Sequence, residues 1–157
     1  MKITLIVVGK TEAEYLVKGI SDYFKRINHY MSFNEVVIPA LKNTGSLSED
    51  LQKQKEGVLI LNCMKSTDEL ILLDEKGDKF SSVSFAEFIQ KKMISGTKNL
   101  VFVIGGPYGF SDSVYNRANM KISLSEMTFS HQMVRLIFSE QLYRAMTIIK
   151  GEPYHHK

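Results

Sequence analysis

The stretch SLSEMTFSHQ, residues 123–132, decides how the end of the chain is organised. Its first residues alternate as in a β-strand, yet hydroxyl side chains crowd it. It leads directly into HQMVRLIFSEQLYRAMTII (131–149), which has apolar residues at nearly every helical position. A helix that is apolar on all sides must be buried on more than one side. The segment 131–149 therefore predicts a helix covered by the sheet on one face and, on the other, by a second copy of the chain related by two-fold symmetry.

Upstream of this stretch, apolar β-rich runs alternate with segments of helical periodicity. The predicted strands cover residues 3–8, 34–40, 69–74, 100–106 and 121–125. The predicted helices follow possible capping pairs, in which a hydroxyl and a carboxylate satisfy free N–H groups of the first turn. These pairs are Thr11 with Glu14, Ser46 with Glu49, and Ser84 with Glu87. A shorter helix is predicted near 112–118.

Strands that are apolar on both faces and separated by helices predict an α/β fold, with a parallel sheet of about five strands covered by helices on both faces. No repeat or boundary divides the chain, so residues 1–157 are predicted to form one domain. In such sheets, ligands bind at the carboxyl ends of the strands. Those ends carry Leu73–Asp74, Ile104–Gly106 and Ser123–Ser125.

Composition limits the function only loosely. The formal net charge of +3 permits an anionic partner but does not require one. Cys63 is the only cysteine, which excludes an internal disulfide and fits a reducing cytosol. It lies in an apolar run, so we interpret it as a small hydrophobic residue rather than a catalytic thiol. The run at 3–8 is too short to span a membrane, so we expect a cytoplasmic protein with no membrane partner.

The segment GGPYGF (105–110) follows a predicted buried strand. Glycines there let the backbone turn sharply and let a ligand approach main-chain N–H groups. The segment is not GxGxxG and lacks the lysine of a phosphate loop, so it predicts neither a dinucleotide nor a triphosphate. A simple turn from strand to loop is the alternative.

Polar residues near the C-terminus are the other candidates. Arg144, within an apolar helix, is predicted to meet an anion or a polar substrate; the alternative is a surface ion pair with Glu140, four residues away. Tyr154 beside His155 can stack on a base and handle a proton, whereas the alternative is a frayed basic end. No cysteine and histidine set has zinc spacing, so no metal is expected.

Motifs along the whole chain resemble the RlmH family of the SPOUT superfamily. The motifs are VGK (8–10), KEG (55–57), LD (73–74) with Gly77 and SS (81–82), VIGGPYG (103–109), SLSEMTFSHQMVR (123–135), EQLYRA (140–145) and PYH (153–155). The resemblance implies a SPOUT-like fold with a deep trefoil knot in its C-terminal part, S-adenosylmethionine as methyl donor, and a homodimer. It also implies methylation of N3 of a pseudouridine in the intersubunit-bridge stem-loop of 23S rRNA, on assembled ribosomes, with no DNA partner.

The resemblance also implies site residues, position by position. The implied cofactor contacts are Leu73, Gly105, Leu124, Ser125, Glu126, Met127, Thr128 and Phe129. The implied catalytic residues are Arg144, Tyr154 and His155, in an active site composed from both subunits.

Three positions depart from the family pattern. Ser130 stands where the family usually has proline, and a serine can cap the last helix instead. Asp78 replaces a lysine that commonly follows the glycine, and His156 is an additional residue near the terminus.

Two other functions stay open from the sequence. One is a nucleotide-binding α/β enzyme, such as a hydrolase that uses the glycine turn. The other is a non-catalytic ribosome-binding or assembly factor on the same fold.

Overall fold

The computed structural model describes residues 1–156. Its elements are β1 (Lys2–Val8), α1 (Glu14–Ile27), β2 (Ser32–Ile38), the 3-10 turn η1 (Thr44–Ser46), α2 (Glu49–Asn62), β3 (Glu69–Lys79), α3 (Ser82–Ile94), β4 (Asn99–Ile104), α4 (Asp112–Arg117), β5 (Met120–Ser123) and α5 (Met133–Lys150). Every predicted strand and helix is present. Among residues 1–156, no helix is both long enough and apolar enough to cross a membrane.

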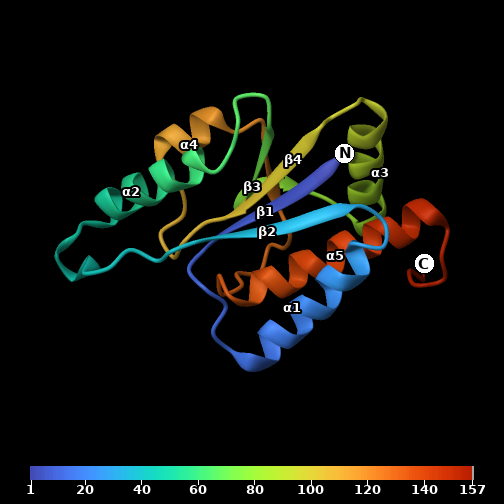
Figure 1. The fold of residues 1–157 in the computed structure, drawn as a ribbon, viewed down its shortest axis with the longest axis horizontal. Helices are drawn as coiled ribbons and strands as arrows, with labels where there is room; N and C mark the ends of the chain where they lie inside the picture. Colours follow the sequence, from blue (N-terminus) through green and yellow to red (C-terminus); the bar gives the residue numbers. More distant parts are fainter. Residues whose placement is uncertain (157) are drawn as a thin grey trace.

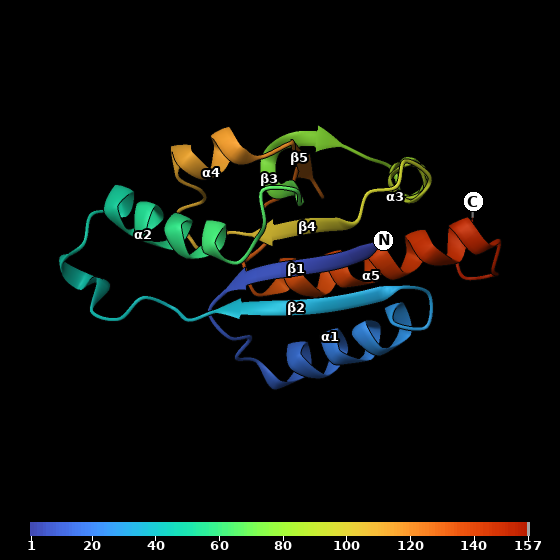
Figure 2. The ribbon, with the colours of Figure 1, turned by 45° about the horizontal axis from the view of Figure 1, so that its top comes forward.

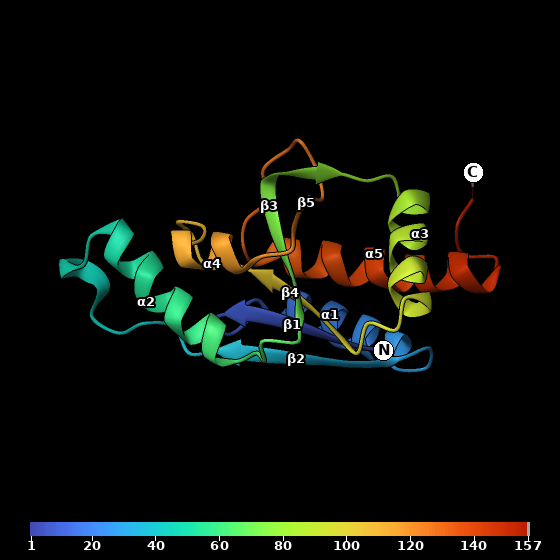
Figure 3. The ribbon, with the colours of Figure 1, turned by 90° about the horizontal axis from the view of Figure 1, so that it is seen from above.

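The five strands form one parallel sheet in the order β2-β1-β4-β3-β5 (Figure 1). This confirms the predicted α/β class. β3 continues past its predicted end at Asp74, and its register with β5 shifts between Leu73 and Asp78. The strand bends there, as Figure 3 shows. A Cβ on Gly77 would lie 2.5 Å from the backbone N of Ile122, so only glycine lets the two backbones approach this closely.

Helices cover both faces of the sheet, as predicted. α1, α3 and α5 pack on one face, around a core that includes Leu5, Phe102 and Phe138. α2 and α4 pack on the other face, around a core that includes Ile6 and Val103. Figure 2 shows α1 and α2 on opposite sides of the sheet. Successive β1 residues thus enter different cores, which explains why the strand is apolar throughout.

α5 lies between α1 and α3 on its face of the sheet. Much of its apolar surface is therefore covered within the chain, so the need for a second subunit is smaller than the sequence predicts. Met133 and Ile137, one turn apart, are left half-buried. The homodimer and the trefoil knot stay predictions.

The capping pair predicted at Thr11 and Glu14 is wrong. The N-cap of α1 is Ala13, which makes no side-chain capping bond. The hydroxyl of Thr11 instead accepts a hydrogen bond from Nη1 of Arg135, at 3.0 Å. The local pattern predicted that the Thr11 hydroxyl caps α1, but this hydroxyl binds the distant Arg135 instead.

Three further local predictions are wrong. α2 is capped by Ser48 rather than Ser46, and α3 is capped by Ser81, whose capping box uses Ser84 as its third helical residue. In each case a neighbouring hydroxyl occupies the extended N-cap position. Cys63 is exposed, because it is the C-cap of α2 rather than a core residue.

Arg135 is fully buried and joins the end of β1 to the start of α5. Its guanidinium donates to the carbonyl oxygens of Val8 at 2.8 Å, Gly9 at 2.9 Å and His131 at 3.2 Å. Burial lowers the pKa of Arg135, and the nearby carboxylate of Glu35 opposes this effect. A buried charge is tolerated here because its donors are satisfied.

We predict that Arg135→Met lowers the free energy of unfolding by roughly 2–4 kcal/mol, because several buried carbonyl groups lose their donor. Urea unfolding measures the change. The matched control is Lys18→Met on the exposed side of α1, which should stay within about 0.5 kcal/mol of the wild type. Equal stability of the two variants would contradict the structural role of Arg135.

Candidate functional site

A cavity of about 540 Å³ opens at the carboxyl ends of β4 and β5 and at the bend of β3. We call it the edge cavity. Three segments line it: residues 73–76, 104–110 and 122–131 without Glu126, with Tyr115 and Val134 added. Its volume is within the range of small-molecule sites, roughly 300–1,000 Å³. The cavity lies where parallel sheets bind ligands, as the sequence predicts.

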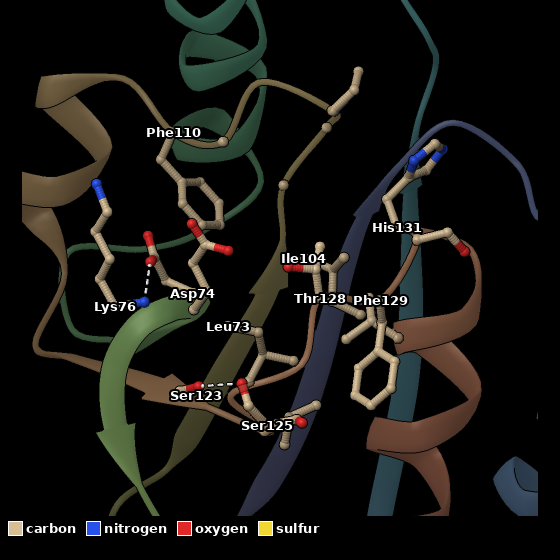
Figure 4. Close-up of a pocket in the computed structure, with 18 of the residues that line it drawn as sticks. Leu73, Asp74, Lys76, Ile104, Phe110, Ser123, Ser125, Thr128, Phe129 and His131 are labelled. Carbon is tan, nitrogen blue, oxygen red and sulfur yellow. Dashed lines mark hydrogen bonds between the residues drawn. The ribbon is translucent and has the colours of Figure 1, made fainter.

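Side chains from the three segments surround the edge cavity (Figure 4). Leu73 and Ile104 lie in the middle and are the last residues that pair between β3 and β4. Asp74 and Phe110 lie on one side of them, while Thr128, Phe129 and His131 lie on the other. The wall therefore combines apolar surface with a few polar groups, which is typical of a site for an organic ligand.

The segment 124–129 has an unusual backbone. Among residues 1–156, its main-chain groups make no backbone–backbone hydrogen bond. Side chains hold its shape instead: Oγ of Ser123 donates to the carbonyl of Ser125 at 2.9 Å, and N–H of Met127 donates to Oγ of Ser125 at 2.9 Å. Most N–H and C=O groups of this wall are thus available to a ligand or to water.

The glycine turn forms the second wall. N–H of Gly109 donates to the carbonyl of Gly106 at 3.1 Å, and Gly109 has φ +81°. A Cβ on Gly106 would lie 2.7 Å from Oε2 of Glu56. The turn can therefore pack directly on that carboxylate only because position 106 has no side chain.

The predicted cofactor residues line the edge cavity with one exception. Glu126 is not part of the wall; its exposed side chain pairs with Lys79. That hydrogen bond lowers the pKa of Glu126. Any contact of Glu126 with the cofactor would therefore use its main chain. The structure brings the other predicted residues together, but their binding role stays a prediction.

Ser130 begins the turn into α5. Its Oγ accepts a hydrogen bond from N–H of Met133 at 3.1 Å, and its carbonyl accepts from N–H of Val134 at 3.0 Å. The N-cap of α5 is Gln132, which makes no side-chain capping bond, so the prediction that serine caps this helix in place of proline is wrong. Ser130 instead bonds the first N–H of the helix from the preceding turn.

Sequence reasoning missed the fixed carboxylate of Asp74. Its Oδ1 accepts from N–H of Lys76 at 2.8 Å, and its Oδ2 accepts from the hydroxyl of Tyr115. Burial, and then this bond, raise the pKa of Tyr115 above its ordinary value. Asp74 therefore presents a held negative charge at the cavity wall. Its place at the end of β3 was the only signal in the sequence.

Glu56 was also missed. It is only 4% exposed, under the glycine turn, and its Oε1 accepts from Nε2 of Gln52 at 3.2 Å. Burial raises the pKa of Glu56, while Gln52 and His131 oppose the shift. The KEG motif marks the position, but only the fold shows that its carboxylate lies beneath Gly106.

The predicted catalytic residues form a second group, which we call the tail cluster: Glu140, Arg144, Tyr154 and His155. Oε1 of Glu140 accepts from Nη2 of Arg144 at 2.5 Å, from Nε of Arg144 at 3.1 Å and from the hydroxyl of Tyr154 at 3.1 Å. Nη1 of Arg144 lies 3.3 Å from Nδ1 of His155, and the guanidinium lies 4.8 Å from the centre of the Tyr154 ring. The tail is therefore folded onto α5, and the alternative of a frayed end is wrong.

The tail cluster and the edge cavity are at opposite ends of α5. Val134 lines the cavity, and Arg144 follows it by ten residues. At 1.5 Å per residue this separates them by roughly 15 Å along the helix axis. Within one chain the two groups do not meet.

Comparison with known proteins identifies the family. The family model described as "Predicted SPOUT methyltransferase" matches residues 1–155. A protein of Parabacteroides distasonis named "Ribosomal RNA large subunit methyltransferase H" is 59% identical over 157 residues, which is the full length of both chains. A protein of the same name from Flavobacterium psychrophilum is 60% identical over the same full length. The chain belongs to the RlmH family of SPOUT methyltransferases.

Among solved structures, the chain is similar to the SpoU methyltransferase AviRb of Streptomyces viridochromogenes, in complex with AdoMet. The match covers 96% of this chain and 59% of that chain, with 12% identity and a TM-score of 0.45. Among residues 1–156, no three His, Cys, Asp or Glu side chains are grouped so that they could hold a metal ion.

The raised pKa of Glu56 gives a pH prediction. The carboxylate of Glu56 is harder to ionise in the folded state than in the unfolded state, so its charge destabilises the fold once the pH exceeds its folded pKa. Glu56→Gln should therefore raise the free energy of unfolding at pH 7. The gain should shrink toward pH 4, where the unfolded carboxyl is largely protonated.

Urea unfolding across this pH range measures the effect. Glu87→Gln, on the exposed side of α3, is the control and should show little change at either pH. A loss of stability at pH 7 in Glu56→Gln, or a gain that does not depend on pH, would contradict the prediction.

Proposed function

We propose that the chain is an S-adenosylmethionine-dependent methyltransferase that modifies N3 of a pseudouridine in the intersubunit-bridge stem-loop of 23S rRNA, on assembled ribosomes in the cytoplasm. The observation that carries the proposal is the edge cavity, walled by a segment of free main-chain groups, in a member of the RlmH family. The names of the full-length relatives support the large-subunit rRNA as substrate. Family membership also supports the trefoil knot.

The cavity residues fit S-adenosylmethionine. Leu73, Ile104 and Leu124 offer apolar surface to an adenine ring, and the free groups of 124–129 can read its polar edge. The carboxylate of Asp74 offers a negative charge to a cationic ligand. When bound, the cofactor supplies a methyl group on a positively charged sulfur.

A two-fold dimer would bring the two ends of α5 together. Met133, Ile137, Glu140 and Arg144 are spaced by four, three and four residues, so they lie along one stripe of the helix. The stripe is apolar near the edge cavity and charged near the tail. If two copies of α5 pack antiparallel along this stripe, Arg144 of each subunit lies beside the cavity of the other.

In that arrangement the tail cluster can promote loss of the N3 proton. A guanidinium beside the base favours the anion that forms when the proton leaves. Burial, and then the hydrogen bond with Tyr23, raise the pKa of Tyr154, so its hydroxyl stays protonated as a donor. His155 is the candidate to accept or hold the proton. The chain's part in the reaction is therefore to orient the base and stabilise its charge.

The mild charge of the chain supports an assembled particle as substrate. A net charge of +3 is small for a general RNA binder. Recognition of the shape of the ribosome can replace long contacts with the phosphate backbone.

The decisive experiment measures methyl transfer to ribosomes from a strain that lacks the enzyme, with nucleoside analysis of the product. We expect N3-methylated pseudouridine from ribosomes and little product from naked rRNA fragments. Arg144→Ala should lower the rate roughly 100-fold, because a group that stabilises the developing charge is lost. The matched control is Lys91→Ala on the exposed side of α3, which should keep the full rate.

Three results would contradict the proposal. Binding to ribosomes without methyl transfer would indicate an assembly factor. Protection by a nucleotide, rather than by S-adenosylmethionine, would indicate another class of enzyme. Full activity of Arg144→Ala as a folded dimer would remove the assigned role of Arg144.

The cavity assignment has a separate test. Gly106→Ala should weaken binding of S-adenosylmethionine about tenfold or more, because the new Cβ would displace Glu56 and the turn that lines the cavity. Calorimetry measures the affinity. Gly45→Ala is the control, since a Cβ there meets no atom within 4 Å. Equal affinities of the two variants would argue against the edge cavity as the cofactor site.

A further inference from the structure

Tyr23 of α1 and Tyr30 of the turn that follows α1 reach the C-terminal tail, and neither the motifs nor the family match assigns them a role. The hydroxyl of Tyr30 donates a hydrogen bond to Oε2 of Glu152. This bond raises the pKa of Tyr30 above its ordinary value, so the hydroxyl stays a donor. The hydroxyl of Tyr23 lies 3.4 Å from the hydroxyl of Tyr154. Two points on the tail are thus contacted from α1 and the turn that follows it.

Glu152 lies in the turn that sets the direction of the tail. Gly151 has φ +69°, and its N–H donates to the carbonyl of Ile148 at 3.1 Å. N–H of Glu152 donates to the carbonyl of Thr147 at 2.9 Å, which completes a common helix-ending turn. N–H of Tyr154 then donates to the carbonyl of Glu152 at 2.9 Å. The position of Tyr154 therefore depends on Glu152, which Tyr30 holds.

Tyr143 of α5 joins these contacts into one packed group. Its ring centre lies 5.9 Å from that of Tyr23, 6.1 Å from that of Tyr30 and 4.8 Å from that of Tyr154. The guanidinium of Arg26 lies 5.6 Å from the Tyr143 ring centre. Figure 1 shows the C-terminal tail at the end of α5, near the end of α1. Such aromatic pairs add specific geometry to the contact between the helices.

We propose that Tyr30 and Tyr23 are positioning residues for the reaction. They hold the C-terminal tail on α1 and on the turn that follows it, so that Tyr154 and His155 meet the target base in one arrangement. This inference rests on the proposed function, because it concerns the residues assigned there to substrate handling. A chain end without such contacts frays, and the freedom it regains must be removed before each reaction. Holding the tail in advance removes that barrier.

The test is a double-mutant cycle between Tyr30 and Glu152. Tyr30→Phe and Glu152→Ala each remove the bond that joins the turn after α1 to the turn after α5. We expect each variant to lower the single-turnover rate on ribosomes about three- to tenfold, the range for one hydrogen bond. The double variant should be no slower than the less active of the two single variants, because both changes remove the same contact.

Two readouts separate positioning from general damage. Hydrogen exchange of residues 151–156 should speed up in both single variants. Affinity for S-adenosylmethionine, measured by calorimetry, should stay unchanged because the edge cavity lies at the other end of α5. Tyr23→Phe should show the same pattern. Tyr15→Phe is the matched control on the same helix: Tyr15 is 67% exposed, and its variant should keep the wild-type rate and exchange.

Several outcomes would overturn the inference. Independent, multiplying losses in the double variant would show that Tyr30 and Glu152 act separately. Faster exchange with a wild-type rate in Tyr30→Phe would show that tail order does not serve the reaction, while the proposed function would stand. If the wild type methylates nothing, the proposed function fails. Exchange alone then decides: coupled loss of protection supports the hold on the tail, and unchanged protection overturns it.

Discussion

The buried guanidinium of Arg135 is the interaction on which the rest of the structure depends. It binds the carbonyl of Gly9, at the end of β1 and 126 residues earlier in the sequence. It also binds the carbonyl of His131, just before α5 and four residues earlier. The chain between β5 and α5 forms one wall of the edge cavity, and this wall has almost no backbone hydrogen bonds of its own. Arg135 fixes the end of that wall to the sheet. Burying a charge is unfavourable unless its donors are satisfied. The carbonyls of Val8 and Gly9 at the end of β1 accept these donors, and this stabilises the buried guanidinium.

The sequence was sufficient for the fold class because the strands are apolar on both faces. Only a parallel sheet covered on both sides buries such strands, and β1 and β4 are buried along nearly their whole length. The end of β3 could not be predicted in the same way. Residues 75–79 are mostly charged, and Asp78 and Lys79 pair with β5 only because Gly77 permits close backbone contact. The contact between Gly77 and the backbone of Ile122 depends on a missing side chain, so it produces no periodic pattern of apolar residues in the sequence.

Local signals failed where a distant residue competes for the same group. The hydroxyl of Thr11 has the spacing of a cap, but Arg135 takes it. The residues of the candidate site also fall into two groups, those predicted from the sequence and those missed. The glycine turn and the pair Leu73–Asp74 were found from the predicted strand ends, and the residues of 124–129 from the family resemblance. Glu56, Tyr23 and Tyr30 were missed, because each reaches its partner through tertiary packing.

The length of α5 turns these contacts into a constraint on assembly. One helix carries the edge of the cavity at its start and Arg144 near its end, and a rigid helix cannot bring its own two ends together. The reaction therefore needs a second subunit in the proposed function, whatever the affinity of either part for its ligand. Within each subunit, Glu140, Tyr23 and Tyr30 fix the tail cluster to the same rigid body as the cavity. Docking of two such bodies would set the distance from the methyl donor to the target base, and no loop would have to fold when the substrate binds. This explains why contacts from α5, from α1 and from the turn after α1 hold the last residues of the chain.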